Sequence, residues 1–202
     1  MKNFTFTLAA LVIAAFTFAG TPGGPDKYTV DTKKSAVNWV GEKVTGSHQG
    51  TIDIRSGNIT VNRGIIETAE ITIDMGTIVV TDEGMSDDMK GKLKGHLDSP
   101  DFFNVAEHAS ATFSLTAFMP DRQKGGNNYT VTGKLTIKGI SQEISFPATV
   151  EMKDGMIMAN ADLTFDRSKF DIRYGSGSFF DGLGDKMIYD DVKINFTLVA
   201  NK

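Results

Sequence analysis

The sequence predicts an all-β protein in which about eight antiparallel strands and one short α-helix form a barrel or a sandwich. Two observations support this prediction. Apolar and polar residues alternate with a period of two through most of the chain after Tyr28, which is typical of strands with one buried and one wet face. The alternating runs are separated by short turns rich in Gly, Asn and Asp, and only one stretch has helix signals, so the β-α-β rhythm of a parallel sheet is absent.

The composition fits a single folded domain. The chain has 202 residues, of which 23% are charged and 40% are hydrophobic. Its formal net charge is −4, and no cluster of Lys and Arg is interleaved with aromatic residues, which argues against a nucleic-acid partner. Cysteine is absent, and this excludes a disulfide framework, thiol chemistry and a lipoprotein anchor.

The N-terminus has the pattern of a cleaved export signal. Lys2 precedes an apolar run over 8–18, and the small residues Ala19 and Gly20 follow. The run is too short to span a bilayer, and a buried first helix would lack any polar face. We therefore expect a signal peptide over 1–20, a flexible segment over 21–27 and the folded domain over 28–202, with no integral membrane segment in the mature chain.

Four strands are predicted in the first part of the domain. The first carries Trp39, the only tryptophan, which we expect to be mostly buried because of its size. Ser56, Gly57 and Asn58 are turn residues between two alternating runs and predict a hairpin. Each of these strands should present one face to the interior. The four predicted strands cover residues 35–41, 51–55, 59–61 and 65–80.

One helix is predicted after the fourth strand. Ser86 can cap it, two aspartates occupy its first turn, and lysines lie toward its end, as the helix dipole favours. Met85, Met89 and Leu93 recur at helical spacing, which predicts an apolar stripe that docks the helix on the sheet. Gly95 stands where a left-handed C-terminal cap is expected, so we predict that the helix ends there.

The second part of the domain returns to strands after an irregular loop. Pro100 prevents the helix from continuing, and the loop residues Phe102 and Phe103 must either be buried or bind something. Gly133 interrupts one alternating run and predicts a bend or a bulge. The predicted strands cover residues 111–117, 129–137, 143–151, 157–165 and 192–198.

Large apolar residues on the predicted inner faces are the candidate ligand-binding residues. A barrel of about eight strands is wide enough either to be filled by its own side chains or to hold one slender apolar ligand. For each residue, ordinary core packing remains an equally good interpretation. The inner-face candidates are Trp39, Phe113, Leu115, Phe146, Phe165 and Phe196, and the candidates near an opening are Phe102, Phe103, Phe179 and Phe180.

The polar candidates do not form a recognisable catalytic or metal site. The three histidines, His48, His96 and His108, lack the spacing of a zinc site. His96 is expected either to cap the helix end or to contact the polar head of a ligand. Arg167 could bind a phosphate or lie in a solvated turn with its charged neighbours. The glycine-rich segment 175–178 matches neither a dinucleotide fingerprint nor a nucleophile elbow.

Several segments resemble the YceI-like family, a bacterial lipocalin-like group associated with polyisoprenoid binding. The resemblance rests on residues 28–31, 35–39, 95–103, 111–113, 133–144 and 165–170. It implies an extended, lipocalin-like barrel in the periplasm of a Gram-negative bacterium, whose apolar lumen holds an isoprenoid-type chain such as a quinone or polyprenyl lipid. We therefore expect a non-catalytic protein, a monomer or homodimer, whose only bound group is the lipid. Two departures are Asp171, where members often have glycine, and a long loop over 174–184.

Two other functions remain open from the sequence. The first is a hydrolase or isomerase that acts on the bound lipid with His96 or His48 as its base. The second is an envelope stress or interaction module, in which a solid barrel presents the loop over 174–183 to a protein partner.

Overall fold

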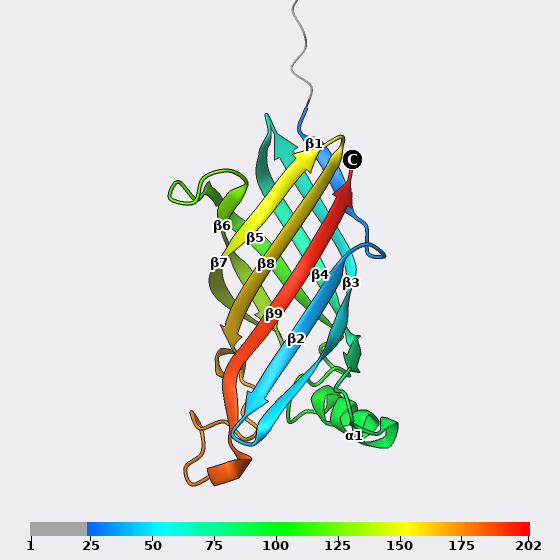
Figure 1. The fold of residues 1–202 in the computed structure, drawn as a ribbon, viewed down its shortest axis with the longest axis vertical. Helices are drawn as coiled ribbons and strands as arrows, with labels where there is room; N and C mark the ends of the chain where they lie inside the picture. Colours follow the sequence, from blue (N-terminus) through cyan, green and yellow to red (C-terminus); the bar gives the residue numbers. More distant parts are fainter. Residues whose placement is uncertain (1–23) are drawn as a thin grey trace, which may run out of the picture.

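A computed structural model describes residues 24–202, so the predicted signal peptide lies outside the described residues. Within this range the chain forms nine strands, one α-helix and two short 3₁₀ helices (Figure 1). In chain order these are β1 (Asp26–Val30), β2 (Ala36–Lys43), β3 (Gly46–Asn62), β4 (Ile65–Val80), α1 (Asp87–Asp98), β5 (Ser110–Pro120), β6 (Asn128–Ile137), β7 (Ile140–Lys153), β8 (Met156–Asp166), η1 (Arg167–Phe170), η2 (Gly184–Lys186) and β9 (Ile188–Asn201).

The sheet closes into an eight-position antiparallel barrel. Each strand from β2 to β9 pairs with the next one along the chain, and β9 pairs with β2 to complete the circle. The short β1 lies in line with β2, because β1 pairs with residues 58–61 of β3 while β2 pairs with residues 46–52. The prediction of an antiparallel barrel of about eight strands with one helix is therefore confirmed. β1 begins at Asp26, so the last two residues of the segment expected to be flexible lie in a strand.

The predicted hairpin at residues 56–58 is wrong, because β3 runs without a break from Gly46 to Asn62. Its pairing with β4 shifts register between Ile54 and Ser56, which marks a β-bulge. Gly57 is buried there, and a Cβ atom on it would lie 2.6 Å from the Val30 side chain. Small residues here allow the strand to bend around the barrel and β1 to pack closely, and they do not reverse the chain.

Helix α1 begins where the sequence predicts, but it ends later. The Ser86 hydroxyl accepts a hydrogen bond from the Met89 backbone N–H, so the N-terminal cap is confirmed. Gly95 lies inside the helix, and the cap is Ser99, whose backbone and hydroxyl both donate to the His96 carbonyl. The predicted apolar stripe is also wrong, since Met89 is 55% exposed and no residue of the helix is fully buried.

The two ends of the barrel differ (Figure 1). The C-terminus and β1 lie at one end, where a cluster of buried residues that includes Ile59, Val150, Ile157 and Ala200 seals the interior. Helix α1 and the segment over 167–187 lie at the opposite end. None of the helices in residues 24–202 combines the length and the hydropathy needed to cross a bilayer.

Candidate ligand-binding cavity

An apolar cavity of about 300 Å³ runs through the barrel. All eight barrel strands contribute to its wall, because the alternating side chains of each strand point inward at every second residue. Its wall exposes almost no polar surface. Pockets for small organic ligands commonly measure about 300–1,000 Å³, so this cavity is small but of ligand size.

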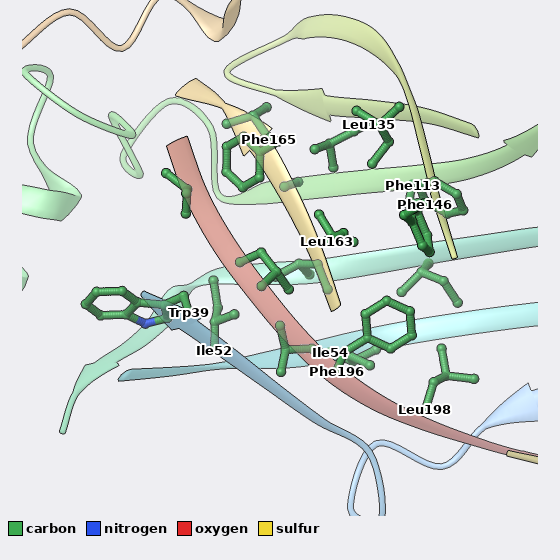
Figure 2. A pocket seen from close by; sticks show the side chains of 18 of the residues that line it. Trp39, Ile52, Ile54, Phe113, Leu135, Phe146, Leu163, Phe165, Phe196 and Leu198 are labelled. Carbon is green, nitrogen blue, oxygen red and sulfur yellow. The ribbon is translucent and has the colours of Figure 1, made fainter. Parts of the chain in front are cut away.

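Most of the predicted binding residues lie in the cavity wall. Eight apolar candidates and one charged candidate are brought together there from seven different segments of the chain. Figure 2 shows Trp39 at one end of the cavity, with Phe165 and Leu163 between it and the cluster of Phe113, Phe146 and Phe196. The predicted residues in the wall are Trp39, Phe102, Phe103, Phe113, Leu115, Phe146, Phe165, Phe196 and Arg167.

Three predicted binding residues lie outside the cavity wall. Phe179 and Phe180 are 40% and 50% exposed. Phe179 lies beneath the Arg173 guanidinium, 4.9 Å from it, and Phe180 lines a separate surface pocket that also contains Lys186. These two phenylalanines belong to a loop that turns outward. The third residue is His96, which lies behind the wall residue Phe102.

Three phenylalanines in the cavity wall pack against one another, and we call them the aromatic collar: Phe113 on β5, Phe146 on β7 and Phe196 on β9. The ring centroids of Phe113 and Phe146 are 5.8 Å apart, and those of Phe146 and Phe196 are 6.0 Å apart in an edge-to-face arrangement. Gly133 faces the Phe113 ring from the neighbouring strand. The bulge expected at Gly133 lies instead on its partner strand β5, between Leu115 and Ala117.

The cavity reaches the surface at the end where α1 lies. Its wall residues there, such as Leu97, Phe103 and Ile188, are only partly buried, whereas those at the opposite end, such as Ile59 and Ile157, are fully buried. We call the end where α1 lies the mouth. Leu97 of α1, Phe102 and Phe103 cover part of it. Trp39 lies on the wall near this end, where its indole N–H donates to the Thr51 carbonyl and its ring covers Gly50. A Cβ atom on Gly50 would be 2.7 Å from the indole.

Arg167 places a positive charge beside the mouth of the apolar cavity. The residue is only 3% exposed, so the prediction that it lies in a solvated turn is wrong. Its guanidinium donates to the carbonyls of Tyr189, Ile172 and Ile188, and one nitrogen lies 3.2 Å from the Asp190 carboxylate. Burial lowers the pKa of Arg167, while the nearby carboxylates of Asp190 and Asp166 oppose the change.

Asp190 completes this polar cluster and was not among the predicted site residues. One of its carboxylate oxygens accepts hydrogen bonds from the hydroxyls of Ser176 and Ser178, and the other faces Arg167. The sequence contains a signal for it, because Asp190 is in phase with the inward residues Ile188 and Val192 of the last strand. A carboxylate at an inward position needs a buried partner of opposite charge.

His96 and His48 are engaged in packing and pairing outside the cavity. His96 lies between the rings of Phe102 and Tyr174, at centroid distances of 4.9 and 4.4 Å, and its Nε2 is 3.4 Å from Asp101. It therefore connects α1 to the two loops at the mouth. His48 pairs with Asp82 across the start of β3. Residues 24–202 contain no group of three or more His, Asp or Glu side chains that could hold a metal ion.

Comparisons with known proteins agree with this architecture. The family model described as YceI-like domain matches residues 28–200. A UPF0312 protein of Pseudomonas fluorescens strain SBW25 is 30% identical over 147 residues, which is 71% of each chain. The crystal structure of Burkholderia cenocepacia BcnA superposes with a TM-score of 0.66 at 29% identity and covers 85% of this chain and 99% of its own. A polyisoprenoid binding domain from Saccharophagus degradans has a TM-score of 0.61 at 17% identity and covers 86% of this chain and 97% of its own.

Proposed function

Because the chain belongs to the YceI-like family, we propose that it is a periplasmic carrier that encloses an isoprenoid-type lipid, a quinone or a polyprenyl chain, and leaves it chemically unchanged. The observation that carries this proposal is the apolar cavity inside a closed barrel. The polyisoprenoid binding named for the structural relative from Saccharophagus degradans supports the choice of lipid.

Burial of apolar surface supplies the affinity in this proposal. Each buried CH₂ group contributes about 0.8 kcal/mol, so a five-carbon prenyl unit contributes on the order of 3–4 kcal/mol before the loss of its freedom is counted. A chain of two or three units then binds without any specific polar contact.

The polar end of the lipid belongs at the mouth in this proposal. Arg167 is the charged residue in the cavity wall, and it lies at that end. Three protein carbonyls and Asp190 already occupy most of the Arg167 donors. The guanidinium therefore contributes mainly to the rigidity of the mouth, and apolar contacts hold the chain.

The periplasmic location rests on the signal-peptide pattern of residues 1–20. Expression of the full chain in a Gram-negative host, followed by osmotic release of the periplasm, tests it. The released protein should have lost a fragment that ends near residue 20 when its intact mass is measured. Retention of residues 1–20 on a cytoplasmic protein would contradict the proposed location.

Lipid binding is tested by extracting the purified protein with organic solvent and identifying the extract by mass spectrometry. We expect an apolar chain in the wild-type extract. Ala69→Phe places a ring inside the cavity and should lower its recovery, because Ala69 lines the wall. Thr68→Phe adds the same ring one residue earlier on the outer face and should leave recovery unchanged. Equal recovery from both variants would mean that the chain binds elsewhere.

The other two functions gain no specific support. His96 and His48 lie outside the cavity wall, so neither faces a bound chain as a base would need to. The barrel interior contains a cavity and is not the solid scaffold that the interaction module assumed.

A further inference from the structure

We propose that Gly133 and the aromatic collar determine the longest chain that the cavity accepts. This inference rests on the proposed function and adds a selection by chain length. It concerns the point where the Phe113 ring, the Gly133 backbone and the rings of Phe146 and Phe196 meet inside the barrel.

Gly133 provides a recess for the Phe113 ring. Both residues point inward from adjacent strands. A Cβ atom on Gly133 would lie 2.3 and 2.5 Å from two carbons of that ring, distances that real Cβ atoms do not adopt. The backbone of Gly133 is in an ordinary extended conformation, so close approach of the ring accounts for the glycine. The ring consequently lies against the wall instead of crossing the cavity.

The collar lies between two parts of the cavity. On the mouth side the wall includes Trp39, Leu163 and Phe165, and on the other side it includes Ala148 and Leu198. Each collar strand lines the cavity on both sides of its phenylalanine, for example Ile144 and Ala148 around Phe146. We call the part beyond the collar the inner chamber. The buried cluster at the end where β1 and the C-terminus lie closes it.

A chain that enters at the mouth must pass the collar before its last units fill the inner chamber. The width of this passage depends on where the Phe113 ring lies, because Phe146 and Phe196 are already in edge-to-face contact. If the recess is filled, the ring must move toward the centre of the barrel. The terminal isoprene units of a long lipid then no longer reach the inner chamber. Short lipids, which bind on the mouth side, are unaffected.

The test measures dissociation constants for a series of linear prenols of two, three, four and nine isoprene units by native mass spectrometry. For the wild type, affinity should rise with each added unit until the inner chamber is full. For Gly133→Ala the affinity should stop rising at a prenol at least one isoprene unit shorter than in the wild type. The longer prenols should therefore bind on the order of a hundred-fold more weakly than they bind the wild type. Binding of the two-unit prenol should change less than about three-fold.

Two further variants separate the collar from backbone strain, because a Cβ atom on Gly133 would also lie 2.7 Å from the Ser114 carbonyl oxygen. Gly133→Ala combined with Phe113→Leu retains that strain but removes the ring, and it should recover the long prenols. Phe146→Trp narrows the collar without altering Gly133. In this variant too, the affinity should stop rising at a shorter prenol than in the wild type. Phe165→Leu, on the mouth side, should weaken all prenols by a similar factor.

The two proposals fail in different ways. A wild-type protein that binds none of the prenols overturns the lipid-carrier function itself. A wild type whose affinity rises with chain length, together with Gly133→Ala and Phe146→Trp variants that keep the same stopping point, overturns the collar alone. A uniform loss at every length in both variants also overturns it.

Discussion

At the scale of single residues, the charge pair of Arg167 and Asp190 takes two charges largely out of water. Both charges have left bulk water, and the pair is compensated by three carbonyls on one side and two serine hydroxyls on the other. Such a pair adds little net stability compared with apolar residues, but removal of one partner leaves an uncompensated buried charge. The cluster therefore holds the segment 167–190 in one geometry.

Asp190→Asn should lower the free energy of unfolding by about 3–5 kcal/mol, because it leaves the Arg167 charge buried without its counter-charge. Urea titration followed by circular dichroism measures the change. Asp191→Asn is the matched control, since Asp191 is the exposed next residue on the same strand, and its effect should stay within about 0.5 kcal/mol. Equal effects of the two variants would show that the pair is not desolvated in solution.

Sequence reasoning identified single residues well where size alone decided their place. Phe113, Phe146, Phe165 and Phe196 are large, alternate with polar residues and lie in the cavity wall, as the pattern predicts. Arg167 was also a candidate, but the sequence favoured a solvated position for it, because a charged residue in a turn is usually solvated. Its partner Asp190 is 23 positions away along the chain, and only the folded barrel brings the two together.

Asp171 occupies a backbone position that would also suit glycine. Its φ is 57°, in the left-handed region, and it ends the short helix η1. Glycine adopts this conformation without cost, and aspartate is among the few other residues that visit it routinely. The glycine that the resemblance leads us to expect at this position and the aspartate found here therefore meet the same backbone requirement.

At the scale of elements, glycines have opposite roles in β3 and α1. A Cβ atom on Gly50 would lie 1.8 Å from the Val79 carbonyl oxygen of the paired strand, whereas a Cβ atom on Gly91 would meet nothing within 4 Å. Gly50 is thus required by strand pairing. Gly91 only weakens the helix in which it lies.

Gly50→Ala should destabilise the barrel by about 3 kcal/mol, because the backbone of β4 must move away from it. Gly91→Ala, the same chemical change in an exposed helical position, should stabilise the protein by about 0.5–1 kcal/mol. Thermal unfolding of the two variants beside the wild type gives both values. A stabilising Gly50→Ala would mean that β3 and β4 lie further apart than described.

Elements were easiest to predict where alternation was long and uninterrupted. The segment predicted as a strand over 65–80 is β4 with the same bounds. The failures are at Gly57 and Gly95, where glycine was interpreted as the end of an element. Glycine marks a bulge, a close approach or a weak helix position as well as a turn, and only neighbouring strands decide among these.

At the scale of the whole molecule, the sequence left barrel and sandwich open. The alternation of apolar and polar residues shows that each strand has one buried face, but strands have one buried face in a barrel and in a sandwich alike. The difference lies in the pairing of β9 with β2, from Ala36 with Thr197 to Lys43 with Ile188. Those partners lie about as far apart in the chain as the domain allows, so local patterns carry no information about them.

A bound lipid should stabilise the whole barrel, because the unfolded polypeptide has no cavity in which to bind it. At a free concentration one hundred times the dissociation constant, ligand adds about 2.7 kcal/mol to the free energy of unfolding. For a chain of this size that corresponds to a rise in Tm of about 5–10 °C. Differential scanning calorimetry of the delipidated protein, with and without added four-unit prenol, measures it. The Ala69→Phe variant should show a smaller rise, and an equal rise in that variant would place the ligand outside the barrel.

The pairing of β2 with β9, which closes the barrel, also has a consequence for how the protein folds. The strand that completes it is the last to leave the ribosome or a translocation channel, while the strand it joins is among the first. Until β9 arrives, the apolar faces of the earlier strands have no closed interior, and an open curved sheet has two unpaired edges. Closure is therefore expected to be the slow, long-range step of folding, and during it the nascent sheet is most exposed to aggregation.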